Sequence, residues 1–114
     1  MSDCIFCKIV RDEIPCAKVY EDDKVLAFDD IHPMAPVHVV IVPKNHISTL
    51  MDVNTEKDDI MNSLTAAAQK VAQIKNIAVS GFRVAINCNA EGGQVVFHLH
   101  VHVLGGRKLQ DELG

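Results

Sequence analysis

The 114-residue sequence lacks the features typical of secreted, membrane-spanning and polynucleotide-binding proteins. No apolar run in it approaches the roughly 20 residues that a membrane-spanning helix needs. Its first ten residues, MSDCIFCKIV, contain neither a cationic region ahead of an apolar run nor a small-residue cleavage site, which argues against a signal peptide. The formal net charge of −4 provides no general attraction for nucleic acid or for an anionic membrane. We therefore expect a cytoplasmic protein that has no membrane and no nucleic acid polymer as its partner.

Repeats, linkers and low-complexity tracts are also missing, so we expect residues 1–114 to form a single domain. Hydrophobic residues make up 48% and charged residues 23% of the chain, an ordinary globular composition. A chain of this length can bury one core without needing disulfides. Without a secretory signal, the four cysteines are better interpreted as thiols or metal ligands. They are Cys4, Cys7, Cys16 and Cys88.

Three histidines at alternate positions stand out in residues 92–106, which read GGQVVFHLHVHVLGG. If the segment is a strand, His98, His100 and His102 share one face, roughly 6.5 Å apart, close enough to act on one anion or to share a metal. The intervening residues are apolar and favour strands, which predicts that they face the core. They are Phe97, Leu99, Val101 and Val103.

Two amphipathic helices are predicted from the spacing of apolar residues. A short helix over residues 4–14 would be ended by Pro15. A long helix would begin at Thr55, with Asp58 completing a capping signal, and run to about Lys75. Its predicted buried stripe consists of Ile60, Leu64, Ala68, Val71 and Ile74.

Four further strands complete the prediction. Asp22-Asp23 forms a turn between the two strands of a hairpin. A β-branched run contains His38 on the side of Val40 and Val42. An alternating segment places Asn87 on its more polar face. We thus expect an α+β domain with a five-stranded antiparallel sheet, one long helix and one short helix. The four strands are residues 18–21, 24–29, 37–42 and 82–87.

The three histidines His98, His100 and His102, called the histidine row below, indicate a catalytic or binding function instead of a purely structural role. Each buried imidazole needs partners for both ring nitrogens, and three together repel one another when more than one is protonated. In one interpretation, they and a histidine of a neighbouring strand form a catalytic zinc site with an open position for water. In the other, a neutral imidazole attacks phosphorus while its neighbours and the Gly92-Gly93 amides bind the phosphate oxygens. Spacing alone does not separate the two.

The sequence HLHVHVL at residues 98–104 matches the His-x-His-x-His-x-x motif, with x apolar, of the histidine triad nucleotide-binding (HIT) family. Four other segments resemble the Hint branch of that family, so the resemblance covers nearly the whole chain. They are Ile5-Phe6-x-Lys8-Ile9, His32-Pro33-x-Ala35-Pro36-x-His38, Gly92-Gly93-Gln94 and Gly105-Gly106-Arg107.

This resemblance implies a homodimeric HIT fold with the two sheets combined across the interface. It also implies a nucleotide-binding hydrolase that cleaves purine nucleoside 5′-phosphoramidates and related nucleoside 5′-phosphate derivatives through a nucleotidyl-histidine. By position, His100 is the nucleophile, His102 and His38 contact the phosphate and the leaving group, and His98 orients the nucleophile. The implied nucleotide contacts are Asp30 to the ribose, Ile31 and Phe28 near the base, and Asn87, Gln94 and Val96 to the phosphate.

Some proteins of this and related families carry a structural zinc held by two cysteines and two histidines. Cys4 and Cys7 have the Cys-x-x-Cys spacing, and two further ligands must come from elsewhere in the fold. His46, at a strand exit, and His98 are the candidates. If the likeness extends to zinc, His98 has a positional role, because a ligating imidazole is not free to act as an acid or base.

Two departures from the Hint pattern concern the leaving group. Val95 stands where many Hint proteins have a serine, and the chain has no tryptophan near its C-terminus. These departures leave the protonation of the leaving group and the preference for it open. We also keep two alternatives to the phosphoramidase. The first is a nucleotide-binding or regulatory module with little turnover, and the second is a zinc-dependent hydrolase that uses the histidine row as catalytic ligands.

Overall fold

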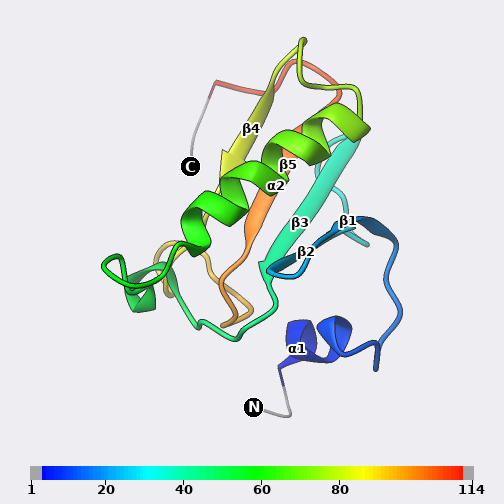
Figure 1. Cartoon of the computed structure of the whole chain (residues 1–114). Helices are drawn as coiled ribbons and strands as arrows, with labels where there is room; N and C mark the ends of the chain where they lie inside the picture. The colour runs from blue at the N-terminus through cyan, green and yellow to red at the C-terminus, as the bar shows by residue number, and fades with distance from the viewer. Residues whose placement is uncertain (1–3, 112–114) are drawn as a thin grey trace.

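The computed structural model describes residues 4–111, which form a five-stranded antiparallel sheet with a helix on each face (Figure 1). The strand order is β1-β2-β3-β5-β4, so neighbours in sequence are neighbours in space except where β5 lies between β3 and β4. The predicted fold class is therefore confirmed. The strands are β1 (Lys18–Glu21), β2 (Val25–Asp29), β3 (Val37–Pro43), β4 (Phe82–Ala85) and β5 (Val101–Gly105).

The sheet separates two apolar clusters because successive residues of a strand face opposite sides. Against one face lies the long helix α2 (Ile60–Ile74), which Figure 1 shows running obliquely across the strands. Against the other face lies the short helix α1 (Ile5–Val10), whose Ile9 packs on Leu26, Phe28, Val40 and Val42. The central strand β3 is buried on both faces, as a β-branched run predicts. No helix in residues 4–111 is long and apolar enough to cross a membrane.

Both helices are shorter than predicted. The short helix ends at Val10, well before Pro15, because Asp12 takes a left-handed conformation with a φ of 62° and Glu13 donates its N–H back to the Lys8 carbonyl. The long helix begins at Ile60 instead of Thr55. The Asn54 side chain accepts hydrogen bonds from the N–H groups of the two residues after Thr55, and this turn competes with helix formation.

The predicted buried stripe of α2 was wrong at its last member. Ile74 is 51% exposed, whereas Ile77, beyond the helix, is only 2% exposed and belongs to the core cluster. The chain turns back after α2, with the Ile77 N–H donating to the Ala72 carbonyl, so Ile77 covers the core at this end of the helix. A single turn of 3-10 helix, η1 (Leu50–Asp52), was not predicted.

Only part of the histidine segment is a strand. His98 and His100 precede β5, and the Leu99 N–H donates to the carbonyl of Ile47, which lies in the loop after β3. Alternation nevertheless continues, because Leu99 is buried in the cluster under α2 together with Val101 and Val103. The prediction that Phe97 faces the core was wrong, since it is 46% exposed.

Candidate functional site

The three histidines of the row lie on the face of the sheet opposite α2. His98 is fully buried and His100 is 8% exposed, while His102 is half-buried. The ring centroids of His100 and His102 are 5.0 Å apart. His38 joins them from β3, with its ring centroid 5.1 Å from that of His102, because β3 and β5 are paired neighbours. The structure thus brings all three predicted catalytic histidines together.

The hydrogen bond made by His100 leaves one of its ring nitrogens suited to nucleophilic attack. Its Nδ1 lies 2.7 Å from the backbone carbonyl oxygen of His98, and a carbonyl only accepts, so Nδ1 carries the proton. In the neutral imidazole, Nε2 then has the free lone pair. The tautomer that a nucleophile needs is therefore selected by the backbone.

The proton positions of His38 and His102 follow from a second chain of contacts. The Met34 N–H donates to His38 Nδ1 over 3.1 Å, so in neutral His38 the proton is on Nε2. That nitrogen lies 2.9 Å from His102 Nδ1 and 3.4 Å from a carboxylate oxygen of Asp30. By accepting from His38, His102 keeps its own proton on Nε2, where it can donate to a bound anion or a leaving group.

The pKa of His102 is lowered to about 4, mainly by burial and further by the neighbouring His100 and His38, against a smaller opposing effect of Asp30. His102 is therefore neutral at pH 7 in the free protein. Its Nε2–H serves as a hydrogen-bond donor until a bound phosphate, by its negative charge, favours the protonated ring.

An apolar pocket of about 180 Å³ lies between α1 and the end of β2. Phe28, Asp30 and Ile31, three of the predicted nucleotide contacts, line it together. Asp30 stands at its rim, with one carboxylate oxygen accepting from the His32 N–H and the other near His38. An apolar cavity with a carboxylate at one side suits a flat base attached to a sugar. Ile5, Phe6 and Ile9 of α1 form the opposite wall.

The loop before the histidine segment is held by Gln94, which is 6% exposed. Its side chain donates to the carbonyls of Ser48 and Val96 and accepts from the Asn89 N–H, and its own N–H donates to the Asn89 carbonyl. Gln94 therefore uses its polar groups to shape the loop. The side-chain amide of Asn87 lies beside Gly93 in the same loop.

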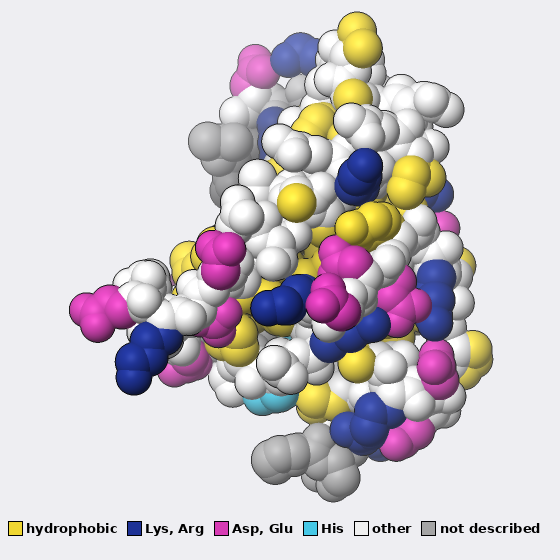
Figure 2. Space-filling model, in the orientation of Figure 1, with side chains coloured by type: hydrophobic (Ala, Val, Ile, Leu, Met, Phe, Trp, Pro, Cys, Tyr) yellow, Lys and Arg dark blue, Asp and Glu magenta, His cyan; other side chains and the backbone are white. Residues whose placement is uncertain are grey.

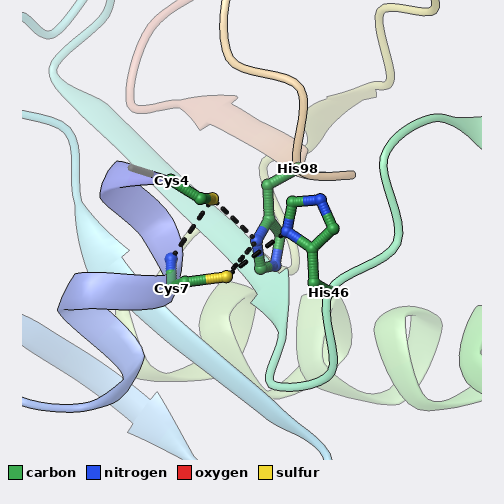
Figure 3. A group of neighbouring side chains, drawn as sticks. All are labelled: Cys4, Cys7, His46 and His98. Carbon is green, nitrogen blue, oxygen red and sulfur yellow. Dashed lines mark hydrogen bonds between the residues drawn. The ribbon is translucent and has the colours of Figure 1, made fainter. Parts of the chain in front are cut away.

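Cys4, Cys7, His46 and His98 form a separate cluster, as Figure 3 shows. Their four ligand atoms lie within 4.8 Å of one another. The Nδ1 atom of His98 is 3.3 Å from the sulfur of Cys4 and 3.5 Å from that of Cys7, and Cys7 is 3.3 Å from the Nδ1 of His46. These side chains, contributed by α1, the loop after β3 and the segment before β5, are close enough to bind a metal ion.

The donor set fits zinc in both spacing and protonation. Tetrahedral Zn–S and Zn–N bonds place sulfur and nitrogen about 3.5 Å apart, close to the separations in the cluster. His98 Nε2 donates to the Pro43 carbonyl over 2.8 Å, and His46 Nε2 lies 3.2 Å from the Ser48 hydroxyl. The proton on His98 Nε2 leaves the Nδ1 lone pair of that ring facing the sulfurs, and the Ser48 hydroxyl can accept from His46 Nε2 in the same way, as hydrogen-bond partners of metal-bound histidines do.

The row does not act as one ligand set. Within residues 4–111, His98 belongs to the cysteine cluster, and His102 groups with His38 and Asp30. His100 belongs to neither group, so a metal shared by all three members of the row has no support in this geometry.

Sequence reasoning missed the residues that orient the histidines. Phe6 contacts the rings of both His98 and His100, at centroid separations of 5.9 and 5.1 Å. In the sequence, Phe6 stands out only as part of the motif Ile5-Phe6-x-Lys8-Ile9. The Met34 N–H and the Pro43 carbonyl are backbone groups, for which no side-chain pattern provides a signal.

Comparison with known proteins decides the family. Residues 11–109 match the HIT domain. The chain belongs to the HIT family. The purine nucleoside phosphoramidase of Escherichia coli K12 is 46% identical to this HIT protein over 107 residues, which cover 94% of this chain and 90% of that one. An uncharacterized HIT-like protein of Synechocystis is 50% identical over 105 residues, covering 92% and 91% of the two chains.

Solved HIT structures agree with this fold. The HIT family hydrolase of Legionella pneumophila superposes with a TM-score of 0.94 at 44% identity, covering 98% of this chain and 100% of that one. A histidine triad protein of Clostridium difficile gives a TM-score of 0.95 at 48% identity, with 98% and 97% coverage.

Proposed function

We propose that this HIT protein hydrolyses the P–N bond of purine nucleoside 5′-phosphoramidates, and of related nucleoside 5′-phosphate derivatives, through a nucleotidyl-histidine. The observation that carries the proposal is the His100 ring, whose Nδ1 is held by a carbonyl while its Nε2 retains a lone pair. The similarity to the E. coli phosphoramidase supports the substrate class. Residues 1–114 act as one domain in this proposal.

The reaction proceeds in two displacements. His100 Nε2 attacks phosphorus, the P–N bond breaks with its electron pair going to nitrogen, and the amine leaves after taking up a proton. The charge of the bound phosphate favours protonation of His102, and the resulting imidazolium donates a proton to the leaving nitrogen and returns to the neutral ring that His38 contacts. Water then attacks the phosphorus and gives up a proton to His102 while the bond between phosphorus and His100 Nε2 breaks, which releases the nucleoside monophosphate and restores His100.

The nucleoside is bound beside these histidines. The base enters the apolar pocket against Phe28 and Ile31, and the ribose hydroxyls donate to Asp30. The phosphate is held by the loop of Asn87 and the backbone around Gln94 and Val96. Because both hydrogens of the Gln94 amide are already used, this residue contributes through the shape of the loop.

We propose that the metal at Cys4, Cys7, His46 and His98 is a structural zinc. Four protein ligands leave no open position for a substrate, which is the arrangement of a structural site. Zinc there supplies a fixed crosslink between α1 and the segment that carries His100. The thiols that it needs are maintained in a reducing compartment, which supports a cytoplasmic location.

We also propose a homodimer in which the two sheets join through β4. This strand is an edge of the sheet, and its Phe82 and Val84 are 37% and 48% exposed. An apolar groove beside it, between β4 and α2, is lined by Met61, Leu64 and Ala68 among others. An exposed apolar edge of this kind is usually paired or covered.

An assay on adenosine 5′-phosphoramidate tests the hydrolase. We expect turnover by the wild type and a loss of roughly 1,000-fold or more in His100→Ala, as for other covalent nucleophiles. The exposed His32 lies outside both clusters, so His32→Ala is the matched control. Turnover that survives His100→Ala would reject the nucleophile, and binding of AMP without any turnover would favour the binding module.

Metal content tests the zinc site. We expect about one zinc per chain in the wild type and in His102→Ala, and a loss in Cys4→Ser and His46→Ala. Retention of zinc in every cysteine and histidine variant of the cluster would reject the site. Activity lost to a chelator while the fold persists, together with zinc lost in His102→Ala, would instead support a catalytic metal.

A further inference from the structure

Helix α1 contributes to two sites at once. Cys4 caps it and Cys7 lies within it, and both sulfurs approach the Nδ1 of His98. The same helix presents Ile5 and Phe6 to the apolar pocket proposed for the nucleoside. The metal cluster and the pocket therefore share one short element.

This helix depends on its contacts for stability. It has six residues, and helices of that length are marginal in water without tertiary packing. Figure 1 shows it standing at one end of the molecule, away from α2. Ile9 packs on the sheet, whereas Ile5 at the start of the helix is 45% exposed. The first turn is held by the contacts of the two cysteines with the histidines of the cluster and by the ring contacts of Phe6.

Phe6 lies between the two cysteines in sequence and between the two sites in space. Its ring meets those of His98 and His100 edge to face, and it contacts Phe28 of the pocket at a centroid separation of 5.8 Å. A displacement of the first turn of α1 would thus move a wall of the pocket and a neighbour of the nucleophile together.

We propose that metal binding at the cysteine–histidine cluster and nucleotide binding in the apolar pocket are thermodynamically coupled through α1, with Phe6 as the positioning residue. Metal ligation replaces weak thiol contacts by bonds and fixes the first turn, so the pocket wall is ordered before the nucleotide arrives. The nucleotide in turn packs on that wall and holds the ligands in place. The inference rests on the proposed nucleotide site, and it assigns the metal a regulatory effect on affinity.

The experiment measures the affinity for AMP by calorimetry in zinc-loaded protein and in protein stripped with a chelator. We expect AMP to bind at least about fivefold more tightly to the loaded form, the lower end of common coupling strengths. Linkage requires the reciprocal effect, so saturating AMP should strengthen zinc retention against a competing chelator by the same factor. Equal AMP affinities in the two forms would overturn the coupling.

Two variants locate the coupling in α1. Phe6→Leu retains an apolar side chain and all four metal ligands, and it should bind one zinc while the ratio of the two AMP affinities falls toward one. Arg11→Ala, an exposed position at the end of the same helix, should keep the wild-type ratio. An unchanged ratio in Phe6→Leu would overturn the role of Phe6.

Circular dichroism and hydrogen exchange of β3 amides show whether the stripped protein keeps its sheet. Global unfolding on stripping would overturn a coupling confined to α1. The test is independent of turnover, because AMP is not hydrolysed in the proposed reaction. If the protein turns over adenosine 5′-phosphoramidate while its affinity for AMP does not depend on zinc, the proposed function stands and the coupling alone is rejected.

Discussion

At the scale of single residues, the three histidines of the row differ in which ring nitrogen is hydrogen-bonded and in the group that it contacts. His98 donates to a carbonyl through Nε2 and turns Nδ1 toward the cysteines. His100 donates to a carbonyl through Nδ1 and leaves Nε2 free. His102 accepts from His38 and retains a proton on Nε2. Identical side chains thus present different ring atoms for the three roles that we propose for them, ligand, nucleophile and donor.

Asp30 allows a direct test at this scale, because its carboxylate lies both at the rim of the pocket and 3.4 Å from His38. We expect Asp30→Asn to lower kcat/KM on adenosine 5′-phosphoramidate by roughly 10- to 100-fold, the loss of a charged hydrogen bond. With the 2′,3′-dideoxy substrate, which has no hydroxyl to bind, the same substitution should have little effect. Equal losses on the two substrates would show that Asp30 acts through His38 instead of the ribose.

At the scale of elements, α2 supports the histidine segment from the opposite face of the sheet. Its buried face packs against Leu99, Val101 and Val103, whose alternation turns the histidines to the other side of the sheet. The outward surface of the helix in Figure 2 is mostly uncharged, because Lys70 is the one charged residue of Ile60–Ile74. Loss of packing under α2 should therefore destabilise the segment that bears the histidines.

Leu64 and Ile74 are a matched pair for testing this support. Leu64 is 2% exposed in the core, and Leu64→Ala should lower the free energy of unfolding by about 2–5 kcal/mol. Ile74 is 51% exposed on the same helix, so Ile74→Ala should change it by less than about 1 kcal/mol. Urea denaturation measures both values. Comparable losses would mean that the end of α2 packs differently from this structure.

At the scale of the whole molecule, the buried neutral His102 makes stability depend on pH. The unfolded imidazole takes up a proton near its ordinary pKa of 6.5, whereas the folded one does so only at about 4. Between these values the unfolded state binds more protons, so stability falls as the pH falls. Because His102 is partly exposed, we expect a discounted loss of about 1–2 kcal/mol across this window.

The measurement is the urea midpoint of chelator-treated protein from pH 7 to pH 4, so that proton competition for metal ligands does not contribute. The pKa of His98 is also lowered, chiefly by burial, and acts in the same direction. His102→Gln should therefore reduce the slope without removing it. An unchanged slope in this variant would argue that His102 is not buried as a neutral ring.

The oligomeric state is also a property of the whole molecule. Val84→Lys places a charge on the exposed edge strand β4 and should convert the proposed homodimer to monomer. Val79, which is fully exposed in the turn before β4, provides the control substitution Val79→Lys. Sedimentation equilibrium distinguishes the two species. A wild type that sediments as a monomer at micromolar concentration would reject the dimer.

The sequence by itself determined the sheet, the two helices, and the alternation of histidines with apolar side chains leading into the last strand. These features depend on local periodicity, which is already present at Leu99, before the regular strand begins. Helix ends were less predictable, because the Asn54 side chain competes with helix formation near Thr55. Nothing local indicated that Ile77 would cover the core in place of Ile74.

Only the tertiary structure decided what each histidine can do. Cys7 and His46 lie 39 residues apart and meet because the loop after β3 passes α1. The groups that select each imidazole tautomer are backbone atoms of Met34, Pro43 and His98, and a sequence pattern does not encode where a carbonyl points. The histidines could therefore be recognised from the sequence, whereas the fold decides which ring nitrogen carries the proton and which role each histidine can take.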